Sequence, residues 1–371
     1  MLRKASFLAT LSALALACSA ASFAQSPYFV LTNDVNSSNS ASIFNLNTTN
    51  GKLSLVKTLS TGGEALQGGY FAGVTQAISP GAACIFVADG GSGDIASFSK
   101  ATGYAKVGNY GDASLMGASN MPMIENSAGT LLYAAYEYSS NLAVWSINQD
   151  CSLALANVYA TDPFLGSMAI THDGSLLLAT FEIFPELDSF TISGSSLTDN
   201  GAVPAITQVS GIAATDDGQV VIMGTAYRTN HPSALVTANL PGFTNQQQWK
   251  VGPGYSAGSI ALTPAAAAGS GCLYVGNTGD GSSGNAGITG AFFTENPLKL
   301  HYVNNVTSTL DTYVGTITTI KDQGNGAGIY AAESAGYIGV YSAAPNCAVT
   351  LVKESPDPNS VFLLSLTGWR K

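Results

Sequence analysis

Arg228 and His231 stand three residues apart in the segment Arg-Thr-Asn-His. A guanidinium group holds an anionic oxygen through paired hydrogen bonds, and an imidazole transfers a proton near neutral pH. Glu182, followed closely by Glu186, offers a carboxylate that can act as a base, alone or with His231. These residue types suit proton transfer beside a group that stabilises an oxyanion. The alternative is that they are ordinary loop charges that pair with neighbouring acids.

Two glycine-rich loops offer oxygen ligands of the kind that Ca²⁺ prefers. They run from Asp89 to Asp94 and from Asn277 to Asn285. Neither loop has the ligand order or the closing glutamate of an EF-hand, and Gly, Ser and Asp are also the usual residues of wide hairpin turns. We therefore expect no bound cofactor, with Ca²⁺ as the alternative.

Several catalytic signatures are absent from the sequence. It contains no P-loop and no H-E-x-x-H helix. No C-x-x-C motif is present either, so a structural zinc site is not expected. Whether the protein is an enzyme remains open at this level.

Residues 1–24 have the features of a cleaved signal peptide. Arg3 and Lys4 precede the apolar segment 5–17, and Ser22-Phe-Ala24 forms a small-x-small cleavage site. The apolar segment is too short to remain as a membrane-spanning helix. We expect cleavage after Ala24, with lipidation of Cys18 as the alternative. The mature chain, residues 25–371, is then a single domain that is periplasmic or extracellular.

Composition excludes several classes of protein. The chain has 371 residues, of which 46% are hydrophobic and 10% charged, and a net charge of −10. Disordered chains are poorer in apolar residues. Nucleic-acid binders carry basic patches, and no Lys/Arg cluster occurs after residue 4. We expect a soluble, monomeric β protein without a transmembrane segment.

A short apolar strand recurs through the whole mature chain. Its clearest copies are Phe29-Val-Leu-Thr-Asn33, Ile85-Phe-Val-Ala-Asp89 and Leu273-Tyr-Val-Gly-Asn277. Seven copies end at residues 33, 89, 136, 181, 225, 277 and 333, about fifty residues apart. Repeats of this length are typical of the four-stranded blades of a β-propeller. The sequence therefore predicts an all-β, seven-bladed propeller of antiparallel blades with very little helix.

The two ends of the chain are expected to share the first blade. The first repeat has no strand before Phe29, and an unassigned apolar strand, 361–366, ends the chain. We expect this C-terminal strand to join blade one and close the ring, which hides the open edges of the sheets.

The repeated strands, Leu273-Tyr-Val-Gly-Asn277 above all, resemble those of the lactonase family of seven-bladed propellers. This family includes 6-phosphogluconolactonase and secreted propellers with YVTN-type repeats. The turn Ser79-Pro-Gly81 is similar to the family's Ser-Pro-Asp-Gly turn but lacks its Asp. The resemblance covers nearly the whole mature chain, and it implies a ligand site at the mouth of the central channel.

Four cysteines remain after cleavage, and their places in the repeat select one pairing among three. Cys84 and Cys272 begin the second strand of a blade, and Cys151 and Cys347 begin the fourth strand of the next blade. These positions share one face, so we expect disulfides Cys84–Cys151 and Cys272–Cys347. Four free thiols are the alternative.

When the loops are assigned to the two faces of the predicted propeller, most acidic residues fall on one face. Thirteen of the 23 acids fall on the face that also holds Arg228 and His231, the basic residues expected there. A solvated acidic rim is one interpretation. The predicted function is a non-catalytic binding or scaffold module for a small molecule, a glycan or an envelope protein. The alternative is a hydrolase of a small neutral lactone, with Glu182 or His231 as base and Arg228 at the oxyanion.

Overall fold

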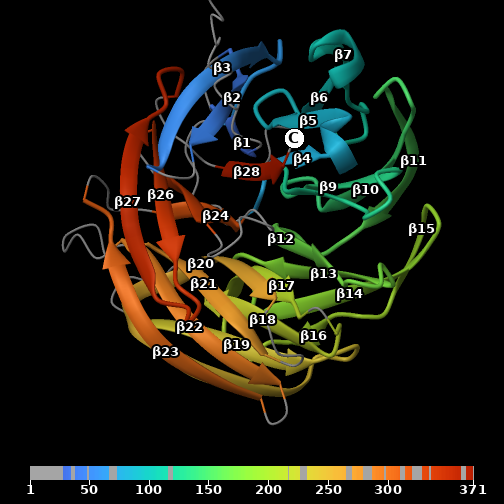
Figure 1. Ribbon diagram of the computed structural model, residues 1–371. Helices are drawn as coiled ribbons and strands as arrows, with labels where there is room; N and C mark the ends of the chain where they lie inside the picture. Colours follow the sequence, from blue (N-terminus) through green and yellow to red (C-terminus); the bar gives the residue numbers. More distant parts are fainter. Residues whose placement is uncertain are drawn as a thin grey trace, which may run out of the picture.

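The computed structural model describes residues 28–34, 38–47, 50–66, 73–115, 120–215, 217–225, 232–264, 270–278, 286–295, 298–309, 314–319, 328–333, 336–360 and 365–370. Their strands form seven antiparallel blades in a ring (Figure 1). We name the strands of each blade A to D from the channel outward. Helical residues in the described ranges are confined to short 3-10 turns, such as η1 (Pro80–Ala82) and η2 (Lys100–Thr102).

The first four blades follow the predicted repeat. In A-to-D order their strands are β28 (Ser365–Arg370), β1 (Tyr28–Asn33), β2 (Ser40–Asn47) and β3 (Lys52–Ser60); β4 (Gln76–Ile78), β5 (Cys84–Asp89), β6 (Asp94–Ser99) and β7 (Ala105–Tyr110); β8 (Met123–Glu125), β9 (Leu131–Tyr136), β10 (Asn141–Ile147) and β11 (Leu153–Ala160); β12 (Leu165–Ile170), β13 (Leu176–Phe181), β14 (Glu186–Ser193) and β15 (Ser196–Asp199), with β16 (Val203–Pro204) also paired to β14.

Blades five and six share one long strand. Strand β20 (Thr244–Pro264) pairs with β19 through its first half and with β21 through its second half, so it serves as strand D and then as strand A. The other strands of blades five to seven are β17 (Val209–Ala214), β18 (Val220–Thr225) and β19 (Pro232–Asn239); β21 (Ser270–Thr278), β22 (Gly287–Glu295) and β23 (Leu298–Thr307); β24 (Val314–Thr319), β25 (Gly328–Glu333), β26 (Tyr337–Ala343) and β27 (Val349–Pro356).

Strand β28 closes the ring, as expected from the missing strand in blade one. It lies antiparallel to β1, with Thr32 opposite Leu366 and Phe29 opposite Trp369 (Figure 1). The Phe29 and Trp369 rings stack with centroids 5.2 Å apart. Of the predicted strand 361–366, residues 365 and 366 lie in β28, and residues 361–364 lie outside the described residues. The turn Asp357–Asn359 is the point where the chain crosses from blade seven toward blade one.

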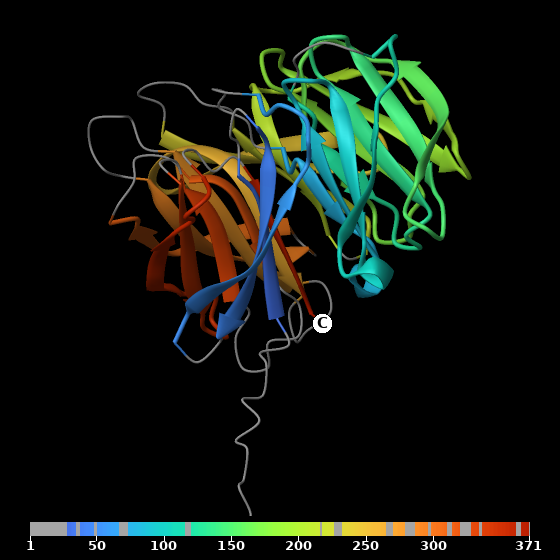
Figure 2. The same ribbon diagram turned by 90° about the horizontal axis from the view of Figure 1, so that it is seen from above.

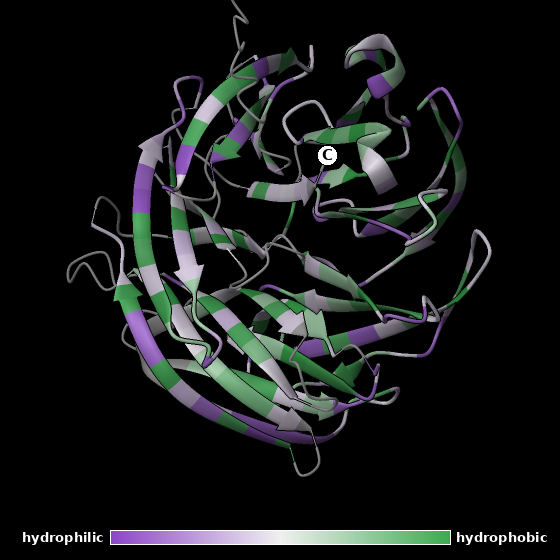
Figure 3. Cartoon of the chain, viewed as in Figure 1, coloured by the Kyte–Doolittle hydropathy of each residue, from purple (hydrophilic) through white to green (hydrophobic). Residues whose placement is uncertain are grey.

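Hydrophobic side chains fill the interfaces between blades. Each of seven clusters in the described residues joins two adjacent blades around the ring. The B-strand aromatics Phe86, Tyr133, Tyr274 and Tyr330 are at most 1% exposed. Because apolar burial is the main driving force of folding, these interfaces hold the blades together. Figure 3 shows hydrophilic segments along the outer strands β3, β23 and β27. Figure 2 shows the ring of blades turned by 90° from the view of Figure 1.

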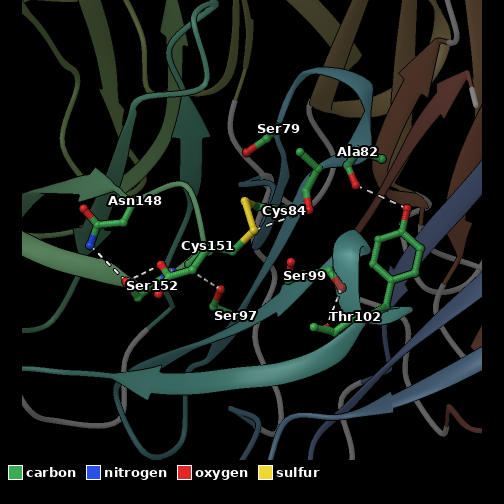
Figure 4. Close-up of a disulfide and its surroundings, with 12 residues drawn as sticks. Ser79, Ala82, Cys84, Ser97, Ser99, Thr102, Asn148, Cys151 and Ser152 are labelled. Carbon is green, nitrogen blue, oxygen red and sulfur yellow. Dashed lines mark hydrogen bonds between the residues drawn. A yellow bond between two sulfur atoms is a disulfide. The ribbon is translucent and has the colours of Figure 1, made fainter.

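Both predicted disulfides are present. Cys84 is bonded to Cys151 and Cys272 to Cys347, with Cα atoms 5.5 and 5.2 Å apart. Figure 4 shows the first bridge between the start of β5 and the turn before β11. Each bridge ties a B strand to the next blade, as the repeat positions indicated. Disulfides fit an oxidising compartment. The predicted signal peptide lies outside the described residues.

Candidate functional site

A cavity of about 590 Å³ occupies the central channel. The A strands of all seven blades contribute to its wall, and most of the side chains are apolar, including Ile78, Ile124, Met168, Ile170, Ile212, Ile260, Leu262 and Ile317. Polar groups come from Gln76, Ser167, Ser259, Thr367 and the A–B turn residues Asn126 and Ser127. The described cavity therefore extends to the face of the A–B turns, opposite the face of the B–C loops.

Among the described residues that line this cavity, Glu125 is the ionisable one. It ends β8, at a place in the repeat where Ile78 and Ile170 stand in the neighbouring A strands. Ser79 Oγ donates a hydrogen bond of 2.5 Å to Glu125 Oε1. Burial raises the pKa of Glu125 to about 7, and the bond from Ser79 opposes that rise. The channel thus contains a carboxyl group that gains and loses a proton near neutral pH.

The opposite end of the A strands is closely packed. A Cβ atom on Gly73 would lie 2.4 Å from the carbonyl oxygen of Gly166 and 2.6 Å from Cβ of Pro122. These residues stand at the starts of the A strands of blades two, four and three. Because a side chain larger than hydrogen would collide with this backbone, glycine at position 73 permits the close approach.

The structure places one of the three predicted catalytic residues. Glu182 is half-buried after β13, and its side chain lies against Gly166, where a Cβ would be 2.1 Å from Glu182 Cγ. Glu186 begins β14 and is also half-buried. Arg228 and His231 lie outside the described residues.

Several acids on the face of Glu182 are buried instead of solvated. Burial raises the pKa values of Asp89, Glu137 and Asp357 to about 7. These side chains are at most 3% exposed. A group with a pKa of about 7 is half protonated at neutral pH, so the negative potential of this face is weaker than a count of its acids implies.

The first candidate calcium loop places its acids among hydrogen-bond donors. Asp89 Oδ1 accepts from Asn39 Nδ2 at 2.8 Å, and its Oδ2 accepts from Asn109 Nδ2 at 3.2 Å. In the described ranges, no three His, Cys, Asp or Glu side chains group as metal ligands. Residues 279–285 of the second loop lie outside these ranges. Nor does any helix of the described residues have the length and apolar character to cross a bilayer.

Sequence reasoning missed Glu125. The available signal was an ionisable residue at the end of an A strand, just before the turn Asn126–Gly129. That signal is weak because the three-residue strand β8 is too short to show an alternation of apolar and polar residues. Its surroundings are also apolar, since Met121 and Met123 belong to the core between blades two and three.

Comparison with solved structures supports the propeller resemblance. A putative 6-phosphogluconolactonase from Bacteroides fragilis superposes with a TM-score of 0.69 at 14% identity, covering 92% of this chain and 97% of that one. A periplasmic gluconolactonase from Pseudomonas aeruginosa gives 0.68 at 14% identity, covering 92% and 98%. A protein from Lactobacillus plantarum gives 0.65 at 12% identity, with the same coverage. At these identities the likeness establishes the fold. No protein-family model and no curated protein sequence matches the chain.

Proposed function

We propose that the protein binds a small neutral molecule in its central channel, and that a lactone or related carbonyl-bearing ring is the ligand class. The observation that carries the proposal is the apolar cavity in which Glu125 is the ionisable lining residue. Its volume of about 590 Å³ falls within the range of small-molecule sites. Binding at this place accords with the predicted role as a binding module, in a periplasm or outside the cell.

The chemistry of Glu125 favours a ligand with a carbonyl oxygen. With a pKa of about 7, Glu125 is largely protonated at pH 6, and a protonated carboxyl group can donate a hydrogen bond to such an oxygen. Apolar lining residues such as Ile124 and Met168 would cover the carbon faces of the ring. A phosphorylated ligand is disfavoured because none of the described lining residues is a cation that could offset its charge.

Lactone hydrolysis is the second candidate function. It is favoured by the fold likeness to proteins described as a gluconolactonase and a putative 6-phosphogluconolactonase. In this proposal Glu182 or His231 takes a proton from water, and Arg228 stabilises the oxyanion formed at the lactone carbonyl.

Calorimetric titration with a neutral gluconolactone, at pH 6 and pH 8, tests the binding proposal. We expect tighter binding at pH 6, because deprotonation of Glu125 removes the donor. Glu125→Gln keeps a donor and should bind equally at both pH values, whereas Glu125→Ala should lose about tenfold in affinity, the cost of roughly one hydrogen bond. The exposed acid Glu64 provides the matched control, Glu64→Gln.

Two results would count against binding in the channel. One is equal affinity in the wild type and Glu125→Ala. The other is preferential binding of the 6-phosphorylated lactone that Arg228→Ala leaves unchanged. Following ring opening in the same samples separates the candidates: turnover that Glu182→Gln abolishes assigns hydrolysis, and binding without turnover assigns a binding module.

A further inference from the structure

Three aromatic rings form a row on the face of the B–C loops, across blades three and four. Tyr138 and Phe164 meet edge to face with centroids 6.0 Å apart, and Phe164 and Phe184 lie 6.3 Å apart at 52°. Tyr138 is 54% exposed, Phe184 38% and the adjacent Ile183 50%. The row, with Ile183, is called the aromatic row below. Large apolar side chains gathered on a surface mark interaction sites more often than isolated ones do.

Phe164 is held in this row by an unusual backbone conformation. Its φ is +67°, in the left-handed region that bulky residues seldom occupy. The Phe164 N–H donates to the carbonyl oxygen of Glu137 at 3.2 Å, and its own carbonyl accepts from the Glu182 N–H at 2.8 Å. Two loops therefore maintain a conformation that costs free energy, and such conformations concentrate at functional sites.

Carboxyl groups accompany the rings. Burial, followed by the charges of Glu137 and Glu182, raises the pKa of Tyr138, which places both carboxyls within electrostatic reach of its hydroxyl. Glu137 is 2% exposed, and its Oε2 has no hydrogen-bond partner among the described residues. The segments 137–141, 161–166 and 181–187 contain no basic residue. A buried carboxyl oxygen without a partner calls for a donor from outside these segments.

We propose that the aromatic row binds an arginine side chain presented by a partner protein. A guanidinium group stacks on aromatic faces and donates paired hydrogen bonds to carboxylates, so it fits the exposed rings and the half-buried Glu182 beside them. In a partner protein, the residues flanking the arginine would cover Ile183 and the exposed face of Tyr138. Free arginine would leave these apolar surfaces exposed to water, so a protein is the better fit. The net charge of −10 attracts a basic partner over a distance.

Surface plasmon resonance with three blocked pentapeptides, alike except for a central arginine, lysine or citrulline, tests this proposal. Citrulline has nearly the shape of arginine but no charge. We expect the arginine peptide to bind about fivefold more tightly than the lysine peptide, because the guanidinium plane stacks on the rings. The citrulline peptide should bind more weakly still, and added salt should weaken the two charged peptides more than the citrulline peptide.

Substitutions in the row locate the binding. Tyr138→Ala and Phe184→Ala remove exposed side chains, so the fold should tolerate them, and each should weaken the arginine peptide about threefold. Glu182→Gln should weaken it as well. Ile206 is 52% exposed outside the row, and Ile206→Ala is the matched control that should bind as the wild type does. Equal binding of the arginine and citrulline peptides, or full binding to Phe184→Ala, would overturn the proposal.

Discussion

Asp34 and Asp357 lie against the same hydroxyl group at the seam of the ring. Thr32 Oγ1 is 2.6 Å from Oδ1 of Asp34 and 3.0 Å from Oδ2 of Asp357. Asp34 follows β1 in the first blade, and Asp357 follows β27 in the last. Ser360 Oγ also donates to the carbonyl oxygen of Asp34 at 2.6 Å. Buried side-chain hydrogen bonds therefore join the ends of the propeller, in addition to strand β28.

Replacing Asp357 with asparagine should stabilise the protein above neutral pH. Burial, and then the charge of Asp34, raises the pKa of Asp357 from 3.8 to about 7 in the folded state. The unfolded state releases this proton near pH 4, so the wild-type free energy of unfolding falls as the pH rises from about 4 to about 7. Asp357→Asn should remove this loss, a gain of up to about 4 kcal/mol at pH 8.

Urea unfolding at pH 4.5 and pH 8 measures this effect. The stabilisation should be present at pH 8 and nearly absent at pH 4.5. Glu64→Gln, at an exposed acid, is the control. A destabilisation by Asp357→Asn at pH 8 would show that the carboxylate is stabilised in the folded protein.

Removing the Ser79 hydroxyl should raise the pKa of Glu125 further. The hydrogen bond from Ser79 stabilises the carboxylate and opposes the effect of burial. In Ser79→Ala, Glu125 should titrate above about pH 7, and the pH-dependent loss of stability that begins near pH 4.5 should extend to higher pH. The carboxyl ¹³C resonance of Glu125 reports this titration directly. A lower pKa in Ser79→Ala would contradict the role given to the hydroxyl.

Each disulfide should contribute substantially to stability. The bridges span 67 and 75 residues, and the chain-entropy relation assigns roughly 4 kcal/mol to loops of this length. The double variants Cys84→Ala/Cys151→Ala and Cys272→Ala/Cys347→Ala should therefore unfold at clearly lower urea concentrations, and by similar amounts. Peptide mapping without reduction should recover the same two pairs, and a Cys84–Cys272 peptide would contradict the pairing.

Closure of the ring should depend on Leu366. This side chain is fully buried in β28, in the cluster between blades one and seven. Leu366→Ala should lower the free energy of unfolding by about 2–5 kcal/mol, the usual range for a buried leucine. Leu55 on the outer strand β3 is 44% exposed, and Leu55→Ala should change stability by less than about 0.5 kcal/mol. Similar effects of both substitutions would show that β28 contributes little to the fold.

The amino-acid sequence by itself determined the blade count, the shared first blade and both disulfides. These features follow from a local pattern. In every blade, the side chains of an apolar strand such as 84–89 or 131–136 face the two neighbouring blades alternately, and the strand ends in the same way. The copies that end at residues 181 and 225 also form B strands, 176–181 and 220–225. A cysteine's place in such a repeat fixes its face, and with it its partner.

Only the tertiary structure decided the environment of each ionisable group. Counting acids by face predicted a strongly negative surface, but Asp89, Glu137 and Asp357 are buried there, and burial disfavours their charged forms. Glu125 lines the channel because it is the last residue of a three-residue strand. Phe164 contacts Tyr138 and Phe184, which belong to two different blades. A pKa or a ring contact depends on distances between segments remote in the chain, and a local pattern carries no record of those distances.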